Sequence, residues 1–329
     1  LVDLRMKAIE QMGQSRGQTR QTGLQQARGA QRVLYSAEVA PFVWDSAFIE
    51  VFGQGRKGFD LVIGNPPYLR QELIDDPRRP VGRERSAGVR IYKDQLARTV
   101  YSVWPATFGY DWCDARARWR LDARSDLYIY FCFHGLSLLG DRGTLCFVVS
   151  SAWLDARYGR DLQEFLLTRG QPKMIIENQA LRTFARAEIN TVILLSGEAQ
   201  DTGAHCPERL GHQIRFVSLN LPFDQALDSS LWRAVAAAPS RTRAGPNRIF
   251  PVRQVRLVKR GTGPDRGSFA SGKWGGKYLR APEIYWLLLE RYPDRLVRLG
   301  QVAGVRRGIT TGANDFFFLS GQEAAEHGI

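Results

Sequence analysis

Four consecutive residues, Asn65-Pro66-Pro67-Tyr68, have the types and spacing needed to hold a planar ring that carries an amine. The side-chain carbonyl of Asn65 and the backbone carbonyl of Pro66 are hydrogen-bond acceptors, and the prolines stiffen the chain because they fix φ. Tyr68 offers a flat face for stacking. Two acceptors facing an exocyclic amine such as adenine N6 would draw that nitrogen towards tetrahedral geometry and free its lone pair for attack. A chance Pro-Pro turn after a strand is the alternative.

The elements around this loop predict an α/β fold. Apolar runs typical of buried strands alternate with segments of helical spacing, which indicates a mainly parallel sheet. The expected strands are residues 59–63, 144–149, 173–177 and 191–196, and the expected helices are residues 126–139, 157–169 and 283–291. In open α/β sheets, ligands bind beyond the carboxyl ends of the strands. The loop follows the first expected strand directly, so it falls at that edge.

The composition favours a polyanionic partner. Lys and Arg number 46 against 33 Asp and Glu, a formal charge of +13, and such an excess favours nucleic acid. No run of about 18 apolar residues predicts a membrane span. The four cysteines lack CxxC spacing and the four histidines lack metal-ligand spacing, so we expect a cytoplasmic protein without metal or disulfide. Cys132 and Cys146 lie in apolar runs and are predicted to be buried thiols.

The remaining segments carry weaker signals. Residues 1–34 are expected to form a helical or linker segment. Residues 69–124 show no clear periodicity and are expected to be an insertion in a catalytic domain of residues 35–225. Arginines are interleaved there with aromatic residues that could stack on bases or pack locally, namely Tyr101, Trp104, Phe108, Tyr110, Trp112 and Trp119. Residues 226–290 are expected to be a basic linker whose arginines either meet phosphates or face solvent. Residues 291–329 are expected to begin a β-rich module.

The order of segments from Pro41 to Gly197 resembles that of the gamma-type adenine-N6 DNA methyltransferases, in particular the Eco57I-like type IIG restriction-modification enzymes and BREX methylases. Asn65-Pro66-Pro67-Tyr68 is similar to the fourth motif of that family. The matches to the third, fifth, sixth and eighth motifs are Phe42-Val43-Trp44-Asp45, Asp126-Leu127-Tyr128, Gly143 to Leu154, and Thr183 to Val192.

This resemblance implies a Rossmann-like methyltransferase sheet that uses S-adenosylmethionine to methylate adenine N6 in double-stranded DNA, with other restriction-modification or defence subunits as further partners. It assigns Asn65, Pro66, Pro67 and Tyr68 to catalysis, and Tyr68 and Phe184 to stacking on both faces of a flipped base. It also implies that Asp45 and Asp126 contact the cofactor. A helix N-cap is the alternative role for both aspartates.

One expected motif is missing. The family's glycine-rich turn after a first strand should precede residue 65, but the glycines of residues 13–29 lie in polar sequence with no apolar strand before them. We therefore expect an internal fragment, with a sheet that is incomplete on its N-terminal side and the start of a target-recognition domain at its end. A methyltransferase acting on RNA or protein glutamine, and a catalytically incomplete DNA-binding fragment, stay open as alternatives.

Overall fold

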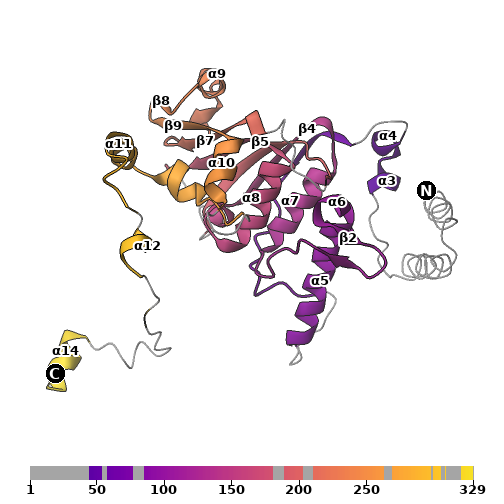
Figure 1. Ribbon diagram of the computed structural model, residues 1–329, viewed down its shortest axis with the longest axis horizontal. Coiled ribbons are helices and arrows are strands. Elements are labelled where there is room, and N and C mark those ends of the chain that lie inside the picture. The colour runs from indigo at the N-terminus through magenta and orange to yellow at the C-terminus, as the bar shows by residue number, and fades with distance from the viewer. Residues whose placement is uncertain are drawn as a thin grey trace. The chain divides into compact units, whose positions relative to one another are not determined.

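The computed structural model describes residues 44–53, 58–76, 85–180, 189–202, 210–262, 269–297, 299–304, 308 and 320–328. The chain divides into two compact units, Leu1–Arg280 and Ala281–Ile329 (Figure 1). The expected segment of residues 1–34 lies outside the described residues.

The first unit is built on a seven-stranded sheet. Its strands, in spatial order, are β1 (Phe59–Gly64), β4 (Leu139–Ser150), β6 (Thr191–Gly197), β5 (Gln171–Asn178), β7 (Gln213–Leu219), β9 (Asn247–Arg253) and β8 (Thr242–Ala244). The α/β class and the four expected strands are confirmed. The expectation of a mainly parallel sheet is wrong for the described strands, because only the β1–β4 and β5–β7 pairings are parallel. An apolar run reports burial of a strand on both faces and is silent about its direction.

Five described strands nevertheless end at one edge of the sheet, namely β1, β4, β5, β7 and β8. β8 and β7 share a direction because both run antiparallel to β9. β1 is parallel to β4, β6 runs antiparallel to both β4 and β5, and β5 is parallel to β7, so β1, β4, β5 and β7 share one direction. The residues that follow Gly64, Ser150, Asn178 and Leu219 therefore lie along a common carboxyl edge. The Asn65 loop follows Gly64 and therefore lies at this edge, where the sequence predicts it.

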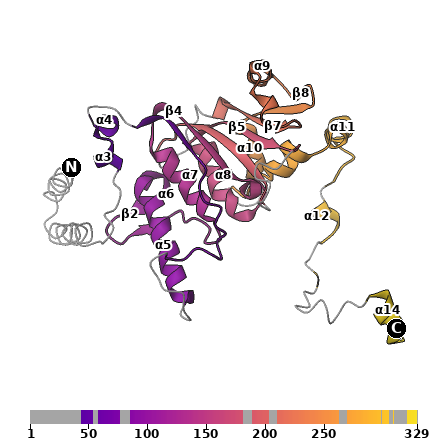
Figure 2. The ribbon, with the colours of Figure 1, turned by 180° about the vertical axis from the view of Figure 1, so that it is seen from behind.

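Four helices cover one face of the sheet, as Figures 1 and 2 show. They are α5 (Arg85–Val103), α7 (Leu127–Ser137), α8 (Arg160–Thr168) and α10 (Gln254–Gly261). α5 packs on α7, α7 packs on α8 and β4, and α8 packs on α10 and β5. α7 approaches β4 so closely that a Cβ on Gly135 would lie 2.7 Å from Leu145 Cδ1. Glycine at this position thus permits the close contact between helix and sheet.

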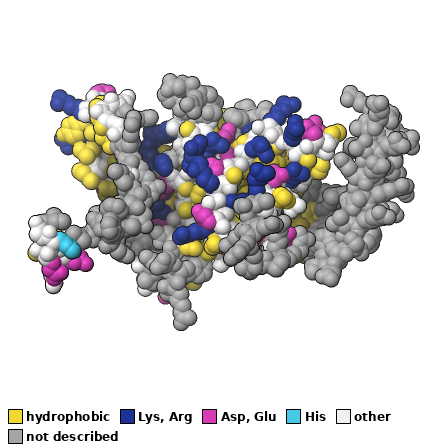
Figure 3. Space-filling view, turned by 90° about the horizontal axis from the view of Figure 1, so that it is seen from below, with side chains coloured by type: hydrophobic (Ala, Val, Ile, Leu, Met, Phe, Trp, Pro, Cys, Tyr) yellow, Lys and Arg dark blue, Asp and Glu magenta, His cyan; other side chains and the backbone are white. Residues whose placement is uncertain are grey.

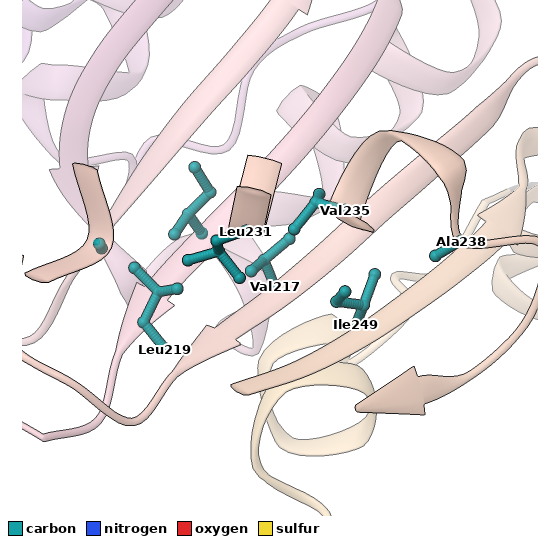
Figure 4. Close-up of a cluster of buried hydrophobic side chains, with 8 residues drawn as sticks. Val217, Leu219, Leu231, Val235, Ala238 and Ile249 are labelled. Carbon is teal, nitrogen blue, oxygen red and sulfur yellow. The ribbon is translucent and has the colours of Figure 1, made fainter. Parts of the chain in front are cut away.

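The opposite face is covered at the β7–β9 end by α9 (Ser229–Ala237). Asp228 begins this helix by accepting a hydrogen bond from the Ser230 amide. Figure 4 shows the resulting cluster, in which residues from α9 and the connection after it meet side chains of the sheet. Its buried members are Ile176, Val217, Leu219, Ala226, Leu231, Val235, Ala238 and Ile249.

The segment of residues 69–124 differs from the irregular insertion that the sequence predicts. Its described residues contain the 19-residue helix α5, the short helix α6 (Pro105–Phe108) and the hairpin of β2 (Tyr110–Asp111) and β3 (Arg116–Ala117). Tyr101, Trp104 and Phe108 are buried, so local packing explains these three aromatic residues, whereas Trp112 is exposed. Arginines on the outer surface hide the helical pattern from a reading based on apolar spacing.

The expected basic linker of residues 226–290 also needs correction. Up to residue 280 its described part contributes α9, β8, β9, α10 and the π-helix η5 (Gly275–Arg280) to the first unit, and α11 (Glu283–Arg291) begins the second. Arg253, Arg256 and Arg260 are exposed, while Ile249, Val252 and Leu257 are buried. Arg248 is half-buried and donates to the Leu279 carbonyl. The basic composition therefore masks an ordinary core pattern.

Several short elements complete the description. These are α3 (Trp44–Ala47), α4 (Ile49–Phe52), η1 (Ser151–Leu154), η2 (Arg157–Gly159), η4 (Gln225–Leu227), α12 (Leu299–Val302) and α14 (Gly321–Glu326). In the second unit the described residues form helices, and most of the stretch expected to open a β-rich module, residues 308–318, lies outside them. Cys132 is fully buried and Cys146 only half-buried. Among the described residues, no helix is both long and apolar enough to span a membrane.

Candidate functional site

The Asn65-Pro66-Pro67-Tyr68 loop leaves β1 at the carboxyl edge of the sheet. Asn65 and Pro67 are exposed, Pro66 is buried and Tyr68 is half-buried. Neither proline can donate a backbone hydrogen bond, and both restrict φ, so the loop presents its carbonyl groups from a stiff backbone. The structure thus brings the four predicted residues together at an accessible position.

A hydrogen bond within the loop orients the Asn65 side chain. The Tyr68 hydroxyl donates to Asn65 Oδ1, and it also lies 3.1 Å from the backbone carbonyl oxygen of Val148 in β4. Burial raises the pKa of Tyr68, so the phenol stays protonated and keeps donating at neutral pH. An amide oxygen has two lone pairs, so Asn65 Oδ1 keeps one for an incoming donor.

The chain after the loop is held by the start of α7. The Leu127 amide donates to the Leu69 carbonyl over 3.0 Å, and the Gln71 amide donates to Asp126 Oδ1 over 2.8 Å. Lys93 reaches the same place from α5 and donates to Gln71 Oε1 over 2.7 Å. Burial lowers the pKa of Lys93, although nearby carboxylates oppose that shift. Residues of the supposed insertion therefore help to fix the exit of the loop.

Asp126 lies at the N-cap position of α7, but its side chain makes no capping hydrogen bond. Its second oxygen accepts from the Tyr158 hydroxyl over 2.7 Å, and the hydroxyl oxygens of Tyr158 and Tyr128 are 2.9 Å apart. Burial raises the pKa of both tyrosines well above the ordinary value, which keeps them protonated. The geometry argues against the capping role and gives Asp126 a role in holding the loop. Its contact with a cofactor stays a prediction.

The structure describes less of the other two predicted site residues, Phe184 and Asp45. Phe184 lies outside the described residues, as does the side chain of Asp45 in α3. The neighbouring Trp44 packs edge-on against Phe59, with ring centroids 5.9 Å apart. Phe59 begins β1 and Asn65 follows its end, which places them about 20 Å apart along an extended chain. The cofactor contact of Asp45 and the stacking role of Phe184 both stay predictions.

Sequence reasoning missed the residues that support the loop. Gln71 and Lys93 carry no local signal, because their pairing depends on how α5 packs beside α7. Tyr158 follows the stretch that resembles the sixth motif, but no local signal connects it with Asp126.

Exposed basic residues occur on α10 and on the face shown in Figure 3. α10 exposes three cations, Arg256, Lys259 and Arg260, and Arg253 at the end of β9 is also exposed. On the face shown in Figure 3, Lys and Arg side chains are interspersed with Asp and Glu. That pattern leaves both readings of the basic segment open, contact with phosphates and solvation.

Comparisons with known proteins agree with the resemblance. The family described as Eco57I restriction-modification methylase matches residues 5–99 and 115–184, half of the chain. The type II methyltransferase M.BstVI of Geobacillus stearothermophilus is 31% identical over 119 residues, which cover 36% of this chain and 16% of that protein. M.PaeR7I of Pseudomonas aeruginosa is 29% identical over 119 residues, covering 36% and 15%.

Among solved structures, a type I restriction-modification methyltransferase subunit from Streptococcus thermophilus is 15% identical, with a TM-score of 0.40 over 63% of this chain and 37% of that one. The chain spans about one sixth of the length of the two curated relatives. On the family match, this chain belongs to the Eco57I restriction-modification methylases.

Proposed function

We propose that this chain carries the base-binding loop of a DNA methyltransferase that transfers a methyl group from S-adenosylmethionine to N6 of an adenine rotated out of the duplex. The observation that carries the proposal is the orientation of Asn65 Oδ1 by the Tyr68 hydroxyl, directly after a strand that ends at the carboxyl edge of the sheet. Two relatives described as type II methyltransferases support the reaction class.

In this proposal Asn65 Oδ1 and the Pro66 carbonyl each accept one N6–H of the adenine. The nitrogen becomes more tetrahedral, and its lone pair points away from the two acceptors. That lone pair forms the new N–C bond while the bond between the methyl carbon and sulfur breaks and leaves its electron pair on sulfur, and one N6 proton is then released to solvent. Tyr68 supports one face of the base and Phe184 the other. Stiffness of the loop matters, because a displacement of about 1 Å can cost roughly a hundredfold in rate.

S-adenosylmethionine supplies the methyl group as an electrophilic carbon attached to a positively charged sulfur. Asp126 fits a role in holding it, since each carboxylate oxygen accepts only one described hydrogen bond and can accept a second, and the side chain is half-exposed. Asp45 is the second proposed contact, on the resemblance alone. The DNA partner is supported by the formal charge of +13.

The test replaces Asn65 by Ala in the protein expressed from its complete coding sequence. Loss of one acceptor should reduce methylation by about a hundredfold or more while DNA binding is retained, by analogy with removal of one oxyanion-hole donor. Asn220→Ala is the matched control, since Asn220 is also an exposed asparagine that follows a strand at the carboxyl edge. Methyl incorporation into duplex DNA, RNA and a protein acceptor is measured for both variants, and the product is sequenced for N6-methyladenine.

Transfer to RNA or to glutamine instead of DNA would overturn the proposed substrate. Unchanged N6-methyladenine with Asn65→Ala would overturn the role of the loop. Absence of transfer by the wild-type protein to all three acceptors would favour a DNA-binding remnant.

A further inference from the structure

The segment of residues 271–280 is anchored in the core before the first unit ends. Trp274 is fully buried and packs edge-on against Trp153 and Phe216, with ring centroids 5.8 and 5.9 Å apart. Tyr278 stacks on Phe216 at 4.7 Å. These aromatic contacts fix the backbone of the segment, so the side chain of Arg280 at its end starts from a defined position.

Arg280 connects the segment that follows β4 with the end of β5. Its Nε lies 3.1 Å from both carboxylate oxygens of Glu177, its Nη1 donates to Asp155 Oδ2 over 3.0 Å, and its Nη2 donates to Ser151 Oγ over 3.0 Å. Glu177 is only 5% exposed. A planar guanidinium with donors in a fixed fork suits several acceptors at once, which an ammonium group does not. Arg280 therefore sets the spacing between the ends of two strands.

The residues held in this way flank the segment that contains Phe184. At the start of that segment, Gln179 Nε2 donates to the Leu279 carbonyl over 3.0 Å and lies 3.4 Å from Glu177 Oε2. At its end, the Ser151 amide donates to the Asn190 carbonyl over 2.8 Å. The Arg280 network thus contacts both ends of the segment, and residues 181–188 between them lie outside the described part of the chain.

The same network reaches the Asn65 loop through β4. The carbonyl of Val148, near the end of β4, accepts from Tyr68, and Ser150 and Ser151 follow two and three residues later. If Ser151 moved, the end of β4 and the Val148 carbonyl would move with it. The Tyr68 hydroxyl, which contacts that carbonyl, would then shift, and so would the Asn65 side chain to which it donates.

We infer that Arg280 is a positioning residue for the reaction under Proposed function, on which this inference rests. It acts through Glu177, Asp155 and Ser151 and holds the ends of β4 and β5 where the base-binding groups converge. Because Arg280 is the last residue of the first unit, the residue that fixes this edge is directly followed by the second unit.

The experiment compares Arg280→Lys and Arg280→Ala with the double variant Arg280→Ala/Glu177→Gln, all in the protein expressed from its complete coding sequence. The double variant removes both charges, so it leaves no buried carboxylate unpaired if the Ala variant alone fails to fold. Arg260→Ala is the matched control. Arg260 reaches the same segment from α10 by donating to the Tyr278 hydroxyl over 3.0 Å.

We expect kcat for DNA methylation to fall about ten- to hundredfold in all three Arg280 variants, with KM for DNA unchanged. We expect Arg260→Ala to leave kcat unchanged. Added guanidinium at low millimolar concentration should partly restore kcat of Arg280→Ala but leave the Arg260→Ala rate as it was. Amide hydrogen exchange should rise in peptides that cover residues 178–180 and 189–192 for the Arg280 variants alone.

Unchanged kcat and exchange in a folded Arg280 variant would overturn the inference, as would an equal loss in Arg260→Ala. A loss of kcat that follows a fall in Tm and shows no guanidinium rescue would also overturn it, because it would show a purely structural role. If the wild-type protein transfers no methyl group, the proposed function fails, and hydrogen exchange alone decides whether Arg280 positions the two strand ends.

Discussion

The two ends of the central sheet are stabilised in different ways. At the β7–β9 end both faces are covered, by the α9 cluster on one side and by Trp274 and Tyr278 on the other. At the β1 end the described residues cover only the face towards α7, and on the other face Leu61 is 57% and Ile63 73% exposed. Among the described strands, β1 pairs only with β4.

The proposed chemistry lies at the less covered end. There the loop after β1 is held by polar contacts, from Tyr68 to Val148, from Gln71 to Asp126 and from Lys93 to Gln71. Hydrogen bonds fix direction more than they add stability, with net contributions of about 1 kcal/mol each. Such an arrangement suits a loop that must present acceptors accurately while remaining accessible. The β7–β9 end, in contrast, is stabilised by buried apolar side chains on both faces.

The largest loss of stability is expected for a substitution at the β7–β9 end, where both faces of the sheet are covered. Phe216 is fully buried between Trp274 and Tyr278, so Phe216→Ala should reduce the free energy of unfolding by about 3–5 kcal/mol. Urea denaturation measures this loss. Phe216→Leu keeps most of the volume and should cost clearly less. A loss under about 1 kcal/mol for the Ala variant would contradict the contrast between the two ends.

The sequence predicts the position of the loop at the edge of the sheet better than it predicts the directions of the strands. The apolar runs locate β1, β4, β5 and β6, and the position of Asn65 after the first run correctly places the loop at the carboxyl edge. Among these four strands the direction of β6 was predicted wrongly, because an apolar run marks a strand without fixing its direction. The alternation of helix and strand was a sufficient guide to the class of fold.

Long-range pairings lie beyond what one sequence can reveal. Lys93 meets Gln71, and Arg280 meets Glu177 across 103 positions, with no local pattern to connect the partners. The arginines of α5 and α10 likewise suggested an insertion and a linker, because charged outer faces outnumber the few buried residues that reveal a helix. The contacts that support the site therefore appear only in three dimensions.

An intermediate loss of stability is expected for substitutions of the polar residues that hold the Asn65 loop. Asp126→Ala leaves the Gln71 amide and the Tyr158 hydroxyl without their acceptor and should cost about 1–3 kcal/mol. Tyr158→Phe removes one donor only and should cost about 1 kcal/mol. Both are measured by urea denaturation. If Asp126→Ala destabilises the protein as much as Phe216→Ala, then the β1 end depends on its polar network as strongly as the other end depends on its core.

The smallest effect is expected at the open face of β1. Ile63 and Ile249 lie on the same face of the sheet, but Ile63 is 73% exposed and Ile249 is fully buried in the α9 cluster. Ile63→Ala should therefore change the free energy of unfolding by no more than about 0.5 kcal/mol, whereas Ile249→Ala should cost about 2–5 kcal/mol. Urea denaturation of the two variants under identical conditions measures the contrast directly. An equal loss would mean that another part of the protein covers Ile63, because only buried apolar side chains have that much packing to lose.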